Sequence, residues 1–171
     1  MIISFSSATT TLPPRQLIAS DRAQEQISRD VLRTIVSPAP ASPSLSVSAI
    51  PDQLPVLRSL VRTVAAHYAL SLDGLSDLVL AVDEAATILI GHALPSSALT
   101  CTFDADTDPA ALRVMLAASA PGEITTSTSS FGWHVIEVLV DAVVLEQVPP
   151  ASPEQNWAAT ITLTKGLQAP S

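Results

Sequence analysis

The sequence DLVLAVDEAATI at residues 77–88 has a regular spacing of apolar side chains. Leu78 and Val82 lie four residues apart there, and other apolar side chains return at the same spacing before and after them. This period is typical of an amphipathic α-helix, which the pattern predicts over about residues 73–93. Glu84 interrupts the apolar run, so it is either a solvated helix residue or a carboxylate with a chemical role.

Apolar residues recur at helix or strand spacing on both sides of this segment. Consecutive strands joined by short turns pair antiparallel, and helices then cover one face of the sheet. The sequence therefore predicts an α+β fold, a two-layer sandwich with a mixed, mostly antiparallel sheet. The expected elements are strands at 45–49, 99–103, 112–116, 143–148 and 156–165, helices at 51–69, 73–93 and 131–141, and a hairpin turn at 104–109.

The composition changes near residue 44. Residues 1–44 form an N-terminal extension with one helical pattern at 14–36, and they end in a linker, 37–44, that contains three prolines. Closely spaced prolines deny a helix and favour an extended spacer. We therefore expect the folded domain at 45–166 and a short tail at 167–171.

Composition and charge restrict the partners. The chain has 171 residues and a net charge of −8, so it lacks the basic footprint that nucleic acid requires. No apolar run approaches the ~20 residues of a membrane helix, and no secretory leader is visible. One cysteine excludes an internal disulfide framework and a cysteine zinc site. We expect a cytoplasmic protein whose acidic domain meets a basic protein surface.

Three segments, 57–62, 80–87 and 131–136, carry a resemblance that covers about residues 45–165. They resemble bacterial anti-sigma factors, the serine-protein-kinase branch of the GHKL (Bergerat-fold) ATPases. The resemblance implies a homodimer that regulates transcription in a stress response by binding a sigma factor. It also implies release of the sigma factor by an anti-anti-sigma protein of the STAS type. Many members phosphorylate that STAS protein on serine with Mg-ATP.

The motifs of the nucleotide pocket are degenerate. Glu84 fits the glutamate of the first motif, but the magnesium-binding asparagine four residues later is Ile88, which offers a hard cation no oxygen. In the family's Asp-x-Gly-x-Gly motif, the aspartate binds the amino group of the adenine. The resemblance implies that Ser119 takes this role here, and Gly122 is the one glycine of the motif that remains. Gly132 alone remains of the glycine-rich lid, whose backbone should approach the phosphates. We expect no bound metal and no efficient phosphoryl transfer, while weak ATP binding through Glu84 and Ser119 stays open.

The first hypothesis is therefore an anti-sigma factor with little or no catalytic activity, and whether the chain is an enzyme stays open. The alternative is an active Mg-ATP-dependent serine kinase, and a third hypothesis is a module that only assembles a complex. Arg58 and Arg62 form either a solvated helix face or a pair that docks a partner. Trp133 belongs to the core or anchors an interface, and His134 is expected on a solvated polar face.

Overall fold

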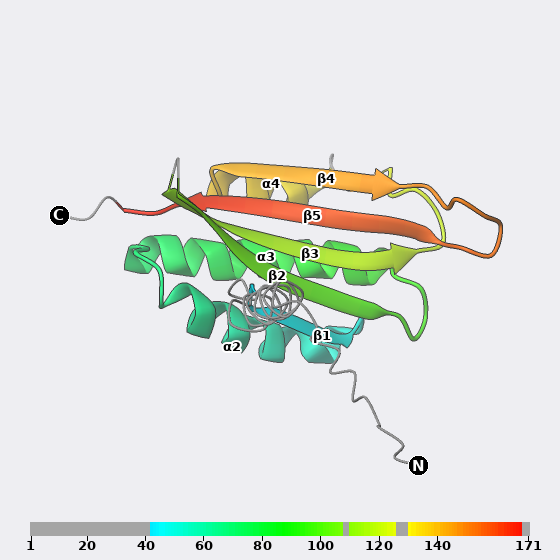
Figure 1. The fold of residues 1–171 in the computed structure, drawn as a ribbon, viewed down its shortest axis with the longest axis horizontal. Coiled ribbons are helices and arrows are strands. Elements are labelled where there is room, and N and C mark those ends of the chain that lie inside the picture. The colour runs from blue at the N-terminus through cyan, green and yellow to red at the C-terminus, as the bar shows by residue number, and fades with distance from the viewer. Residues whose placement is uncertain (1–41, 108–109, 126–129, 169–171) are drawn as a thin grey trace, which may run out of the picture. The chain divides into compact units, whose positions relative to one another are not determined.

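The computed structural model describes residues 42–107, 110–125 and 130–168. The helix expected at 14–36, most of the linker and the last three residues lie outside them. Figure 1 shows the helices on one face of a sheet whose strand order is β1-β2-β3-β5-β4. The elements are β1 (Ser44–Ser48), η1 (Pro51–Gln53), α2 (Leu54–Ala65), α3 (Leu72–His92), β2 (Ala98–Thr107), β3 (Ala110–Ala120), α4 (Phe131–Leu139), β4 (Ala142–Val148) and β5 (Trp157–Gly166).

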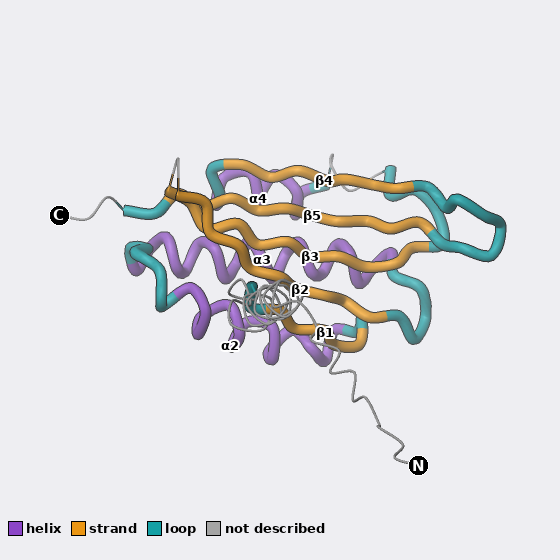
Figure 2. Tube along the Cα trace, in the orientation of Figure 1, coloured by secondary structure: helices purple, strands orange, loops and turns teal. Residues whose placement is uncertain are grey.

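The two layers confirm the predicted α+β sandwich, and every strand pairing in the described sheet is antiparallel. No helix of the described residues covers the second face of the sheet, which we call the open face (Figure 2). Residues alternate along each strand between the helix-covered side and the open face. In β3, for example, Val114 and Leu116 are fully buried under the helices, whereas Met115 on the open face is half-buried.

Local chemistry sets the ends of the helices. Ser71 caps α3, because its Oγ accepts a hydrogen bond of 2.9 Å from the backbone N–H of Gly74. Helix α2 ends at Ala65, earlier than the predicted residue 69, and its last carbonyls accept hydrogen bonds in a tightened turn from the N–H groups of His67 and Tyr68. The side chain of His67 also bonds the carbonyl of Thr63, at 2.8 Å.

One expectation about the sheet is wrong. The segment Asp104–Thr107 was predicted as a turn, yet it continues β2 and pairs with Ala110–Arg113 of β3. Asp104 lies opposite Arg113, and a cross-strand pair of opposite charges favours the ladder over the turn that aspartates otherwise promote. The hairpin between β2 and β3 is therefore longer and its turn shorter than the sequence pattern indicates.

The core lies between the sheet and the helices. Phe103, Leu89 and Ile161 are among its fully buried side chains, and Trp133 is 5% exposed, which places it in the core. Cys101 is 1% exposed, and burial raises the pKa of its thiol to about 12. None of the helices in the described part of the chain has both the length and the apolar character to cross a membrane.

Candidate functional site

The motif residues of α3 and α4 meet where the first turn of α4 packs against the middle of α3. A Cβ built on Gly132 would lie 3.0 Å from Glu84 Oε2 and 3.9 Å from Ile88 Cδ1. The structure thus brings Glu84, Ile88 and Gly132 together from segments that are about fifty residues apart. Glycine is favoured at 132 because a side chain there would press on the Glu84 carboxylate. That carboxylate lies beside the N-terminal turn of α4, where the helix dipole favours a negative charge.

Ser119 is not brought to this cluster. Burial alternates at the end of β3, so Ala118 and Ala120 face the helices while Ser119 is exposed on the open face. Counting back from Gly122 as the last residue of Asp-x-Gly-x-Gly, the aspartate position is Ala118 rather than Ser119. Neither alanine has a polar side-chain atom. The side of the sheet that faces Glu84 therefore carries no side chain at these positions that could bond an adenine.

The segment that follows β3 is held against the sheet. Both backbone polar groups of Ile124 bond the side chain of Gln147 on β4: its N–H donates to Oε1 at 2.7 Å, and its carbonyl accepts from Nε2 at 3.2 Å. Ile124 is itself 3% exposed and belongs to the core cluster. Gly122, two residues earlier, has open space where a Cβ would be. Sequence reasoning missed Gln147, since a polar residue within a strand gives no signal of a partner 23 residues away.

The chemistry of this cluster does not fit a magnesium-bound nucleotide. Mg²⁺ requires near-octahedral oxygen coordination. Glu84 offers one carboxylate, but the side chain of Ile88 one turn further on is a hydrocarbon. The described residues contain no group of three or more His, Cys, Asp or Glu that could hold a metal ion. The arrangement is that of a packed helix–helix contact with one carboxylate at its edge.

A second feature lies between α2 and α3, where a groove of about 430 Å³ opens to solvent. Arg58 on α2 makes a bidentate pair with Asp83 on α3, with Nε–Oδ1 at 2.6 Å and Nη2–Oδ2 at 3.0 Å. The hydrogen bonds and charge of Asp83 raise the pKa of the Arg58 guanidinium, so it stays fully protonated. Arg62, one turn further along α2, is exposed. The groove, which we call the α2–α3 groove, is lined by Arg58, Arg62, Leu75, Ser76, Val79, Leu80 and Asp83.

Polar residues of α4 pair locally instead of forming a site. Glu137 accepts a hydrogen bond from the indole Nε1–H of Trp133 at 3.0 Å and lies 3.0 Å from Nδ1 of His134. These contacts, that of His134 first, lower the pKa of Glu137 despite some desolvation. Asp141 instead accepts from the N–H of Gly166, at 2.6 Å. His134 is 65% exposed in its side chain, which agrees with the solvated face expected for it.

Sequence reasoning also missed the role of Lys165. Its Nζ donates to the carbonyl of Leu139 at 2.7 Å and to Asp77 Oδ2 at 3.2 Å, so one cation joins β5, α3 and the end of α4. Its side chain is only 17% exposed. Lysines at the end of a strand are commonly solvated, and no local spacing indicates partners 26 and 88 residues away.

Comparisons with known proteins agree with this geometry. Residues 47–162 match the family described as the histidine kinase-like ATPase domain. Two relatives named anti-sigma-F factor RsbW, from the CDC 1551/Oshkosh and H37Rv strains of Mycobacterium tuberculosis, are 38% identical over 101 residues. The match covers 58% of this chain and 58% of each relative's length. These matches confirm the resemblance that the motifs carried.

A solved structure shows the same fold. The crystal structure of the RsbU and RsbW domains of a Mycobacterium tuberculosis protein superposes with a TM-score of 0.56 at 18% identity. The match covers 76% of this chain and 34% of that one. At this identity the superposition establishes the arrangement of helices and strands and nothing about partners or chemistry.

Proposed function

Because this chain belongs to the histidine kinase-like ATPase domain family, we propose that it is an anti-sigma factor with a chemically inactive nucleotide site. The observation that carries the proposal is the 38% identity to anti-sigma-F factors across 101 residues. In this proposal the domain binds a sigma factor, and a STAS-type protein competes for the same surface and releases it. Two copies of the chain form the functional unit.

The inactive site follows from the side chains that surround Glu84. Phosphoryl transfer depends almost entirely on positioning and charge stabilisation, which Mg²⁺ and glycine-rich backbone provide. Ile88 removes a metal ligand, and Ala118 presents a methyl group where a polar contact to a base would be needed. Each tenfold loss of rate corresponds to about 1.4 kcal/mol of barrier, so several losses together abolish measurable turnover.

The catalytic half of the proposal is tested with the full chain, Mg-ATP and a STAS protein. We expect no phosphoserine on the STAS protein, and no increase in ATP affinity when magnesium is added in calorimetry. The Ile88→Asn variant restores a single ligand, and we expect it to remain inactive. Phosphate transfer at rates on the order of 1 per second, typical of kinases, would instead establish the alternative function of an active serine kinase.

The α2–α3 groove is the proposed partner surface. Its apolar residues, Leu75, Val79 and Leu80, lie beside two arginines, and Leu80 is 46% exposed. Arg58 is already paired with Asp83, which leaves the exposed Arg62 as the cation that meets a partner. The groove suits a segment that places apolar side chains on Leu80 and one carboxylate on Arg62.

The binding half is tested by capture of purified sigma factors from the native organism. We expect one sigma factor to bind the wild-type chain and the STAS protein to displace it. Arg62→Glu should weaken binding at least tenfold, because it reverses the charge that faces the partner. Asn156→Glu, in the loop between β4 and β5, introduces the same side chain elsewhere and should leave binding unchanged. If no sigma factor binds the wild-type chain, the proposal fails.

A further inference from the structure

Helix α4 exposes apolar side chains that do not contribute to the core. Trp133 and Ile136, on its inner side, are 5% and 0% exposed, whereas Phe131 and Val138 on the outer side are 85% and 86% exposed. The outer side also bounds a hollow of about 300 Å³. We call the residues that line this hollow the α4 stripe: Phe131, His134, Val135, Val138 and Leu139.

The spacing of the α4 stripe is that of a contact between helices. Its members follow one another at i, i+3, i+4, i+7 and i+8, which places them on one side of the helix. A helix at the surface of a domain normally has one apolar side, which faces the core. In α4 a second apolar side faces solvent, and a contiguous exposed apolar surface marks a site of interaction.

We propose that the α4 stripe binds an amphipathic helix of another protein, and that this helix carries basic residues beside its apolar side chains. The partner's apolar side chains cover Phe131 and Val138 and fill the hollow that these residues line, as in other complexes that place a helix in a groove. The stripe is separate from the α2–α3 groove, and the inference does not depend on the proposed anti-sigma function.

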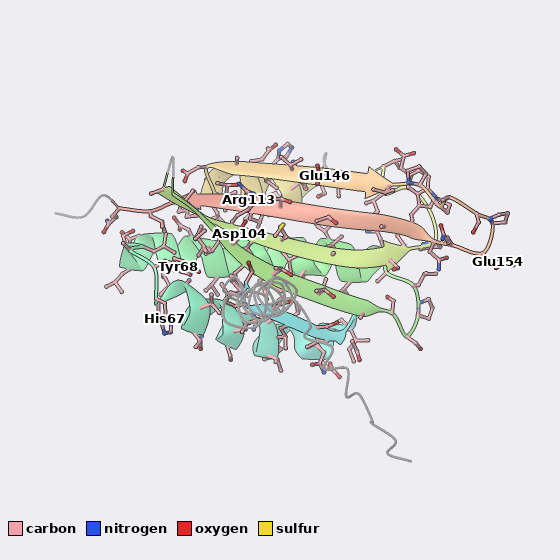
Figure 3. All side chains as sticks on the ribbon, in the orientation of Figure 1. His67, Tyr68, Asp104, Arg113, Glu146 and Glu154 are labelled. Carbon is pink, nitrogen blue, oxygen red and sulfur yellow. The ribbon has the colours of Figure 1, made fainter. Side chains whose placement is uncertain are left out.

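The charges around the stripe select a basic partner. Glu137 is on α4 itself, with 49% of its side chain exposed, Glu84 lies beside the first turn, and the exposed Asp141 follows the last turn. Of the four cations in the folded domain, two are on α2 and Lys165 is engaged by Asp77 and α4 from below. Arg113, labelled in Figure 3, lies on the open face of the sheet. Helix α4 thus presents carboxylates and no lysine or arginine to a partner.

The same charges disfavour two other occupants. A membrane surface that attracts proteins electrostatically is anionic, and it repels a domain with an excess of nine carboxylates. A second copy of the chain would bring its own acidic α4. Helix α4 has only nine residues, which span about 14 Å, so a symmetric contact of this length buries too little area for a stable dimer. One helix of about two to three turns matches it in length.

The test measures binding of the full chain to a fluorescent synthetic peptide of about 18 residues, long enough to form a helix. The peptide has leucine at the spacing of the α4 stripe and lysine at the other positions. A second peptide has glutamate in place of every lysine. By fluorescence anisotropy we expect the lysine peptide to bind with a Kd on the order of 10 μM, as suits a small interface. The glutamate peptide should bind at least tenfold more weakly.

Val138→Glu separates apolar docking from attraction between charges alone. The added carboxylate would strengthen a purely electrostatic complex with the lysine peptide. We expect binding to weaken at least tenfold instead, because the burial of the valine side chain is lost. Leu72→Glu introduces the same side chain at another exposed apolar residue, at the start of α3, and should leave binding unchanged. Circular dichroism checks that both variants are folded.

A second measurement locates the peptide without any substitution. In amide NMR of the isotope-labelled full chain, addition of the lysine peptide should shift the resonances of α4. The resonances of α2, which lines the other groove, should stay in place. Shifts confined to α2 would overturn the assignment to α4.

Each other outcome also overturns the inference. A wild-type chain that binds neither peptide, or both equally, refutes a basic helix as the partner. Binding that Val138→Glu leaves unchanged or strengthens places the peptide elsewhere on the acidic surface. Binding to vesicles of phosphatidylcholine and phosphatidylglycerol that Val138→Glu abolishes would assign the stripe to a lipid surface. A lower molar mass in Val138→Glu would assign it to a contact between copies. Capture of a sigma factor is measured separately, so the proposed function stands or fails independently of the peptide.

Discussion

At the scale of single residues, two of the few cations in this domain pair with groups on other elements of the fold. Of the four in the domain, Arg58 binds Asp83 across two helices, and Lys165 joins β5 to Asp77 and to the end of α4. The first contact joins α2 to α3, and the second joins α3 and the end of α4 to the sheet. Their energetic weight differs, because the side chain of Lys165 is 17% exposed and that of Arg58 is 41% exposed. Solvent weakens the more exposed pair.

Replacing Lys165 tests this difference. Lys165→Met keeps the aliphatic packing but leaves the carbonyl of Leu139 at the end of α4 without its donor. We expect a loss of about 1–2 kcal/mol in the free energy of unfolding, measured in urea. Asp77→Asn keeps the bond to Leu139 and should cost less than about 1 kcal/mol. Equal losses in the two variants would show that the bond to Leu139 contributes nothing.

The pKa of Glu137 predicts a dependence on pH. The contacts of His134 and Trp133 lower this pKa in the folded state, so the charged carboxylate stabilises the fold above the unfolded pKa of about 4.3. That stabilisation is lost as the pH falls through the lower, folded pKa. We expect wild type to exceed Glu137→Gln in melting temperature at pH 7, and the difference to shrink as the pH falls below about 4.3.

Carboxyl NMR measures the cause directly. In a His134→Ala variant the pKa of Glu137 should rise toward its ordinary value, since the largest contribution to the shift is removed. An unchanged pKa in that variant would assign the shift to another neighbour.

At the scale of helices and strands, periodicity predicted the fold because the domain has one covered face and one open face. Leu112, Val114 and Leu116 alternate with Arg113 and Met115, and that alternation identifies β3 and its buried side. The extent of β2 could not be predicted, because the turn propensity of its aspartates is local and their ladder with β3 is not. The face of the sheet on which Ser119 lies could not be predicted for the same reason. Moving the motif by one residue along the strand places each of its side chains on the opposite face of the sheet.

The site was predictable only in part, for the same reason. The spacing of Glu84 and Ile88 on one helix face is local and was visible in the sequence. The contacts of Gly132 with Glu84, of Arg58 with Asp83 and of Gln147 with Ile124 join separate elements. Only the tertiary structure brings those residues together.

The cap of α3 provides a test at this scale. Ser71→Ala removes the acceptor for the N–H of Gly74, and we expect a loss of about 1 kcal/mol in stability. Ser76→Ala removes a hydroxyl that bonds the carbonyl of Leu72 within the helix, and it should change stability by less than about 0.5 kcal/mol. Urea unfolding of both variants measures the contrast, and an equal effect would rule out a special role for the cap.

At the scale of the whole molecule, the excess of nine carboxylates in residues 45–171 should act on the two proposed associations in opposite directions. It attracts a basic partner over a Debye length of about 10 Å at 0.1 M salt, and it repels a second copy of the chain. Raising the salt from 50 to 500 mM should therefore slow association with the sigma factor by about tenfold, with a smaller change in its dissociation rate. The same change should tighten the proposed homodimer, because salt screens the repulsion between two acidic copies. Stopped-flow association and sedimentation in one salt series measure both effects. A dimer that weakens as salt rises would mean that charge pairs hold the two copies together.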